Sequence, residues 1–83
     1  MSHDRPGNDY RSIPCANYDE YESAILRHRR LRLVWHSGNV IHDQVITPLN
    51  LRTAQGEEYL VLRLASGEIT EIRLDRIRRS ETL

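Results

Sequence analysis

The sequence has little of what marks several common classes of protein. Its one cysteine, Cys15, cannot form a disulfide within the chain. Twelve basic residues, all of them arginines, are balanced by twelve acidic residues, so the basic excess typical of nucleic-acid binders is missing. There is no charged-then-apolar leader and no long apolar run. We therefore expect a cytoplasmic protein without a membrane partner.

The length and composition favour a small binding module. At 83 residues and 39% hydrophobic content, without low-complexity runs, the chain is expected to form one ordinary globular domain. A chain this short buries too little surface to hold a deep substrate pocket beside its core. We expect a protein that is not an enzyme.

The first residues differ from the rest. Residues 1–12 are polar, contain Pro6-Gly7-Asn8 and show no helical or strand periodicity, which predicts a flexible tail. Pro14 favours an extended conformation at Ile13. A single domain is expected over residues 13–83.

A helix is predicted from about residue 18 to residue 29. Asn17 followed by Glu20 resembles a capping box. Acidic residues fall in the first turns and arginines at the end, which would complement the helix macrodipole. Aromatic, apolar and imidazole side chains recur at the spacing of one helical face: Tyr18, Tyr21, Ala24, Ile25 and His28.

After Arg30 the period of the apolar residues changes to two, which is typical of half-buried strands. Turn signals at Ser37-Gly38-Asn39 and Ser66-Gly67 indicate two hairpins. Pro48 is expected to end the second strand, because proline cannot donate to a central ladder, and residues 49–57 are expected to form a loop. Strands are predicted within residues 31–36, 40–46, 58–65, 69–74 and 77–80.

These elements define an α+β, mostly β, fold class. Five short strands after a helix would suffice to close a strongly bent Sm-like (SH3-like) barrel, with the helix over one open end and no long sheet edge exposed. A flat open sheet with the helix on one face fits the periodicity nearly as well.

The segment from Ile13 to Glu22, IPCANYDEYE, resembles the start of the Rho-binding antiterminator (Rof) family, whose pattern there is I-x-C-x-x-Y-D-x-x-E. Further family positions follow in order and at near-constant spacing: Ala24, His28, Leu31, Leu33, Gly38, residues 58–61, Gly67-Glu68 and residues 71–77. The resemblance covers roughly residues 13–77. A departure lies at residues 48–57, which are longer than usual for the family and contain Arg52 alone among basic residues.

The resemblance implies an Sm-like barrel whose N-terminal helix binds the transcription termination factor Rho at the RNA-binding site of its N-terminal domain. Termination would then be inhibited by competition with RNA. Tyr18, Asp19 and Glu22 are the residues expected to contact Rho. Carboxylates suit a site that binds RNA through basic side chains.

Simpler roles remain open for the same three residues. Asp19 and Glu22 would stabilise a helix N-terminus by about 0.3–1 kcal/mol each without any partner. Tyr18 stands on the apolar stripe, where core packing is the common role.

Two other functions are weighed. An Sm-like RNA-binding module would use the cluster Arg27, Arg29, Arg30 and Arg32 with Trp35 nearby, although the zero net charge disfavours direct contact with nucleic acid. A thiol enzyme would use Cys15 with His28 as base, but no motif supplies an orienting group or an oxyanion site; we expect Cys15 to act as a small buried hydrophobe.

No cofactor and no metal are expected, because the four histidines lack the close spacing of a zinc site: His3, His28, His36 and His42. Charges near the strand edges, such as Arg63 and Arg78, favour a monomer when the protein is free.

Overall fold

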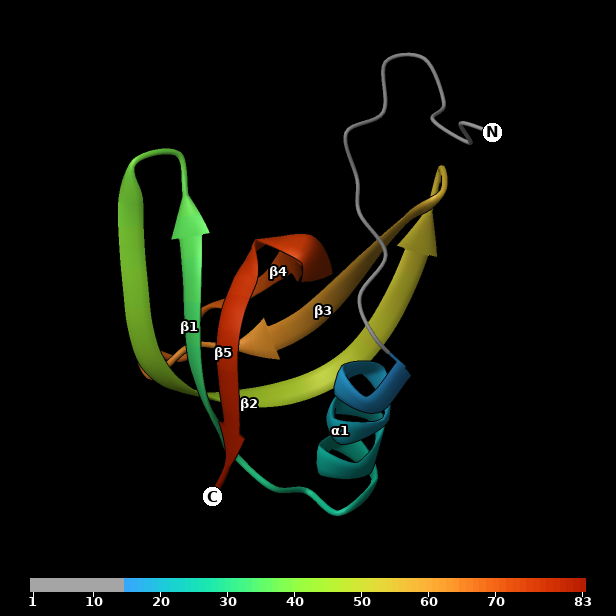
Figure 1. Ribbon diagram of the computed structural model, residues 1–83. Coiled ribbons are helices and arrows are strands. Elements are labelled where there is room, and N and C mark those ends of the chain that lie inside the picture. The colour runs from blue at the N-terminus through green and yellow to red at the C-terminus, as the bar shows by residue number, and fades with distance from the viewer. Residues whose placement is uncertain (1–14) are drawn as a thin grey trace.

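In a computed structural model, which describes residues 15–83 and the side chains from residue 17, one helix precedes a five-stranded sheet (Figure 1). The elements are α1 (Cys15–Leu26), β1 (Leu31–Ser37), β2 (Val40–Ala54), β3 (Glu57–Arg63), β4 (Ile69–Arg73), the 3-10 helix η1 (Leu74–Arg76) and β5 (Ile77–Thr82). The predicted flexible tail, residues 1–12, lies outside the described residues.

The strands lie in the order β4-β3-β2-β1-β5, and every neighbouring pair is antiparallel. Strand β2 belongs to both halves of the sheet. Its first part pairs with β1, from Ser37 opposite Val40 to Leu31 opposite Ile46. Its second part pairs with β3, from Thr47 opposite Arg63 to Ala54 opposite Glu57. Figure 1 shows β2 curving across the molecule, so the sheet is strongly bent.

The prediction that Pro48 ends the second strand and that residues 49–57 form a loop is wrong. Strand β2 passes through Pro48 and continues to Ala54. The register between β2 and β3 shifts between Pro48 and Asn50, and such an irregularity tolerates a residue that cannot donate to the ladder. Proline therefore marks the place where β2 passes from one half of the sheet to the other.

The hairpin after this strand is tight. Gln55 and Gly56 connect β2 to β3, and both have positive φ, 54° and 78°, as a two-residue type I′ turn requires. The predicted turn at Gly38 is confirmed, with φ of 60° at the first central position of the β1–β2 hairpin. These short turns leave the strands in fixed register.

The core forms on the inner face of the bent sheet, under helix α1. The alternation of Leu31, Leu33 and Trp35 is confirmed, because all three are buried. From the opposite half of the sheet, Leu60 and Leu62 are fully buried. The core is completed by Tyr21, Ala24, Ile46, Ile72 and Leu74. The alternating buried residues of β1 and of β3 thus belong to one apolar core.

Helix α1 ends three residues earlier than predicted. Its last helical residue is Leu26, and His28 follows with a left-handed φ of 56°. The Arg29 N–H then bonds the Ala24 carbonyl at 2.9 Å, and the His28 N–H bonds the Ile25 carbonyl at 3.3 Å. This is the pattern of a Schellman motif, which stops a helix. His28 is exposed and not on the buried helical face.

This helix end predicts a stabilising substitution. Left-handed φ costs a residue with a side chain about 1–2 kcal/mol, and glycine avoids most of that cost. His28→Gly is expected to raise the free energy of unfolding by about 0.5–1 kcal/mol, measured by chemical denaturation. Arg27→Gly, one residue away and without positive φ, serves as control and is expected to lower it; a gain from both variants would contradict this reading.

The predicted fold class is confirmed at the level of an α+β, mostly β, domain with one helix and five strands. The closed Sm-like barrel is not confirmed, because the sheet is open, with β4 and β5 at its two edges. The flat-sheet alternative is not supported either, since the sheet bends sharply along β2 (Figure 1).

Candidate functional site: the outer face of helix α1

Helix α1 has three sides with different environments. One side faces the core, where Tyr21 is 2% exposed and Ala24 is 1% exposed. The helix packs against β2. The sequence of α1 contains no basic residue, so its solvent side carries acidic charge alone.

The second side faces β5 through Glu20. Its two carboxylate oxygens accept hydrogen bonds from the Ser80 hydroxyl at 2.7 Å and from the Thr82 hydroxyl at 3.2 Å. The predicted capping box is therefore wrong, because the helix begins at Cys15 and Glu20 fastens it to the last strand. This contact fixes the rotation of α1 on the sheet.

The third side is turned to solvent and carries two of the three predicted contact residues. Asp19 and Glu22 are both exposed and stand three positions apart, which places them on one helical surface. Neither takes part in a hydrogen bond or ion pair with any residue that the structure describes. Two carboxylates thus lie on one helical surface, and none of the described residues supplies a cation that pairs with them.

The helix-dipole role proposed for these carboxylates loses its basis. No acidic residue lies in the first turn of α1 and no basic residue in its last, and the interaction with the macrodipole fades beyond the first turn. The predicted charge complementarity of the helix ends is wrong, because the helix begins and ends three residues earlier than the sequence suggested.

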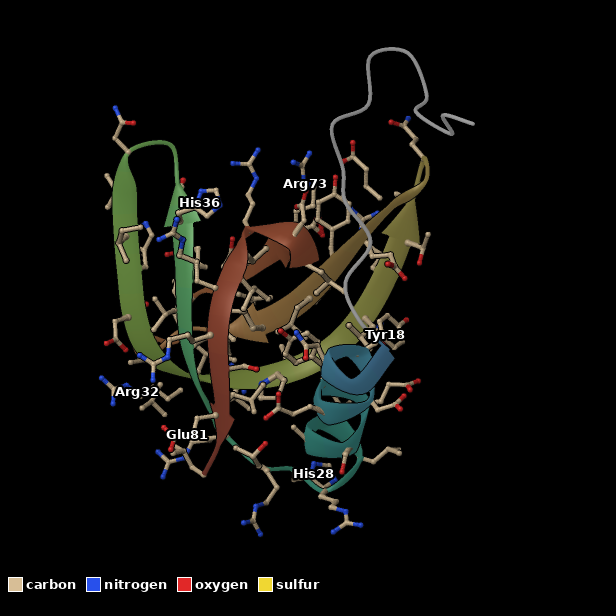
Figure 2. The ribbon with its side chains drawn as sticks, viewed as in Figure 1. Tyr18, His28, Arg32, His36, Arg73 and Glu81 are labelled. Carbon is tan, nitrogen blue, oxygen red and sulfur yellow. The ribbon has the colours of Figure 1, made fainter. Side chains whose placement is uncertain are left out.

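Tyr18 lies near the N-terminal end of α1 (Figure 2). Its ring is half-buried and packs against the core. Desolvation raises the pKa of the Tyr18 hydroxyl, and the charges of Glu58 and Glu22 raise it further. The hydroxyl therefore stays protonated near neutral pH and is available as a hydrogen-bond donor.

A groove of about 280 Å³ runs between α1 and β2. Tyr18 and Glu22 line it, so the structure brings these two predicted residues together, whereas Asp19 lies on the adjoining surface. The other lining residues are Ile25, Leu26, Asn50 and Leu51. The groove therefore combines apolar side chains with one carboxylate, that of Glu22.

Sequence reasoning missed Leu26, which is 79% exposed at the end of α1. Asp19, Glu22 and Leu26 follow one another at positions i, i+3 and i+7, the spacing of a single helical face. That spacing was a usable signal. The outer helix face is defined here as Tyr18, Asp19, Glu22 and Leu26.

The arginine cluster considered for RNA binding does not form one free basic surface. Arg32 donates two hydrogen bonds to Asp43, at 3.0 and 2.8 Å, and these hold the pKa of the Asp43 carboxyl below its ordinary value. Arg29 donates to the Leu83 carbonyl at 2.9 Å. Trp35 is 7% exposed and belongs to the core, so it offers little surface for stacking on a base.

Arg52, in the segment where the chain departs from the family pattern, is also engaged. It donates two hydrogen bonds to Glu71, at 3.0 and 2.6 Å. Its guanidinium carbon lies 5.0 Å from the centre of the Tyr59 ring. Arg52 therefore stabilises the face of β2, β3 and β4.

The remaining predictions concern cysteine chemistry, metal binding and the membrane. The Cys15 side chain lies outside the described residues. Among the side chains that the structure describes, no three His, Cys, Asp or Glu residues are grouped to hold a metal ion. Within the same part of the chain, no helix has the length and apolar character needed to span a membrane.

The fold and this face define a small α+β domain with an acidic, partly apolar helix surface. A solved structure, Proteasome accessory factor B/C (PafBC) of Arthrobacter aurescens, contains a similar fold, with a TM-score of 0.77 and 22% sequence identity. The match covers 90% of this chain and 12% of that one, and at this identity it shows the fold alone. No curated protein matched the sequence.

The sequence itself gives the family. Residues 12–83 match the family described as ROF, modulator of Rho-dependent transcription termination. The chain belongs to this family. The resemblance seen in the sequence is confirmed, and the role described for the family is to modulate Rho-dependent transcription termination.

Proposed function

We propose that the protein binds the transcription termination factor Rho at the RNA-binding site of Rho's N-terminal domain and thereby keeps RNA from loading. It would act as an antiterminator. The observation that carries the proposal is the outer helix face, on which Asp19 and Glu22 have no internal partner among the described residues, in a chain of a family that modulates Rho-dependent termination.

The physical basis is a match of charge. A surface that binds RNA must offer basic side chains to phosphates, and carboxylates can take the place of those phosphates through charge-assisted hydrogen bonds. Asp19 and Glu22 lie three positions apart on one surface, so one docking event can engage both. Neither forms an ion pair with a residue from 17 to 83, so no ion pair within that part of the chain has to break first.

The neighbouring side chains would add contact area to the charges. Tyr18 can donate a hydrogen bond and cover apolar surface, as tyrosines at binding hot spots do. Leu26, 79% exposed, would bury apolar area on contact. Tyr18 and Glu22 also share the groove beside β2, which offers room for a side chain of the partner.

The protein would work by binding and not by catalysis, as a monomer when free, in the cytoplasm where Rho acts. The bent sheet with its covering helix would correspond to the Sm-like barrel that the family resemblance implies. Direct RNA binding through Arg27 to Arg32 receives no support from the contacts of Arg32 and Trp35 described above.

Transcription through a Rho-dependent terminator tests the proposal. With purified RNA polymerase and Rho, adding the protein is expected to increase read-through transcript in proportion to the fraction of Rho bound. Raising the Rho concentration should restore termination. Unchanged read-through at saturating protein would contradict an antiterminator role.

A Leu26 variant tests the apolar part of the site. Leu26→Ser is expected to weaken Rho binding by about fivefold, since roughly 1 kcal/mol of apolar burial is lost, while the free energy of unfolding stays within about 0.5 kcal/mol because the side chain is exposed. Isothermal titration calorimetry gives the affinity. Ile69→Ser is the control, because Ile69 is also exposed, at 56%, but lies on β4; this variant should bind Rho normally, and an equal loss in both variants would contradict the assignment.

A further inference from the structure

A second hollow lies away from helix α1, between the β1–β2 hairpin and the strands β3 and β4 with η1. Its volume is about 440 Å³, within the range of roughly 300–1,000 Å³ typical of small-molecule sites. His36 and Arg73 line it and lie at the same end of the molecule in Figure 2, opposite His28 at the far end of α1. No role described above uses this cavity.

Aromatic rings form much of its wall. Trp35 and His42 stack with ring centres 4.8 Å apart and planes 15° from parallel. Tyr59 from β3 and His36 from β1 line the same space. The Tyr59 hydroxyl donates a hydrogen bond to the Glu57 carboxylate at 2.6 Å, and this bond fixes the orientation of the Tyr59 ring. The wall therefore offers flat, polarizable surface to a planar ring.

The charges of the cavity do not cancel. Arg73 is held by Asp75 at 2.7 Å and lies 3.7 Å from a carboxylate oxygen of Glu57. Glu71, the acidic residue of the lining, is held by the two hydrogen bonds from Arg52. These ion pairs account for the lining charges other than that of Arg76.

Arg76, in η1, is half-buried and lines the cavity. It forms no hydrogen bond or ion pair with any residue from 17 to 83. Burial removes part of the water around such a guanidinium, and an anionic ligand could take the place of that water. The planar guanidinium also matches the geometry of a phosphate. Among the described residues that line the cavity, Arg76 is thus the cation without an anionic partner, and it lies beside an aromatic wall.

We propose that this cavity binds a small ligand that joins a phosphate group to a flat aromatic ring, the class to which nucleoside monophosphates belong. Arg76 would hold the phosphate, with a ring N–H of His36 as a second donor. The planar ring would lie against the wall formed by His42 and Tyr59. The site is distinct from the outer helix face and does not depend on binding to Rho.

The protein carries its own reporter for this site. Trp35, the one tryptophan of the chain, lines the cavity. Titrating the full chain with adenosine 5′-monophosphate is expected to change Trp35 fluorescence in a saturable way. Arg76→Gln should weaken the affinity by at least about tenfold, because a charge-assisted bond is lost. Arg78→Gln, an exposed arginine on β5 outside the lining, is the matched control and should bind like the wild type.

Separate ligands isolate each part of the proposal. Adenosine without phosphate, and inorganic phosphate alone, are both expected to bind more weakly than the nucleotide. The proposal is overturned if millimolar nucleotide leaves Trp35 fluorescence unchanged, if Arg76→Gln and Arg78→Gln bind equally, or if adenosine binds as well as its monophosphate. Tighter binding of hexauridylate lacking terminal phosphates would also overturn it, in favour of an extended RNA surface.

Discussion

Replacing Asp19 with arginine is expected to weaken binding to Rho by about 100-fold or more. Removing one partner of an interfacial charge pair typically costs about 2–5 kcal/mol, and a reversed charge adds repulsion from the basic surface. The fold should be unaffected, because Asp19 is exposed and forms no hydrogen bond or ion pair with the described residues. Affinity is measured by calorimetry and folding by circular dichroism and thermal unfolding.

The control for this reversal is Glu68→Arg, which makes the same change of charge in the exposed turn before β4. It alters the net charge equally but lies outside α1, so binding should fall only by the small amount that long-range electrostatics accounts for. Equal loss of affinity in both variants would mean that net charge, and not this helix face, governs the interaction. Unchanged affinity in Asp19→Arg would remove Asp19 from the site.

Truncating Leu62 to alanine is expected to cost about 2–5 kcal/mol of stability, since the side chain is fully buried and leaves a cavity. Small domains are stable by about 5–15 kcal/mol, so this variant would lose a large part of its folded population on mild denaturation. Equilibrium unfolding in urea measures the loss.

Ile69→Ala on β4 gives the matched comparison, because Ile69 is 56% exposed and its truncation should change stability by less than about 0.5–1 kcal/mol. A small effect at Leu62, comparable to that at Ile69, would contradict the placement of the core between the two halves of the sheet.

The part of the fold that the sequence predicted is the part that burial dictates locally. The alternation at Leu31, Leu33 and Trp35 follows from one buried and one solvated strand face, and the same rule identified Leu60 and Leu62. Gly38 and Gly67 marked turns because both adopt positive φ. These features need only neighbouring residues to be recognised.

The predicted end of the helix and the predicted end of the second strand are both wrong, because an uncommon local conformation overrides the usual preference of the residue type. His28 entered the left-handed region without being glycine, so nothing in its residue type announced the helix end. The residue type of Pro48 predicts the end of a strand, but the register shift beside it lets β2 continue. The error affects more than one residue, because the second half of β2 pairs with β3. Through this pairing β2 joins the two halves of the sheet.

Of the candidate site, the sequence indicates the residues of the helix motif but not those that strand pairing brings beside the helix. Tyr18, Asp19 and Glu22 were named from the family motif in one short segment. The sequence predicts a loop at Leu51, whereas its position in the groove beside α1 depends on a strand pairing that no local pattern shows. Trp35 is buried, whereas Arg32 is exposed and bonds Asp43 on the neighbouring strand. The partner of Arg32 likewise depends on the pairing of β1 with β2.

Competition with RNA for Rho tests the central claim most directly. The protein is titrated into purified Rho carrying a fluorescent pyrimidine-rich RNA, and the anisotropy of the RNA is followed; the same RNA without Rho is titrated in parallel. We predict full release of RNA from Rho, and no binding of the protein to the RNA alone. RNA that stays on Rho at saturating protein, or that binds the protein directly, would contradict the account.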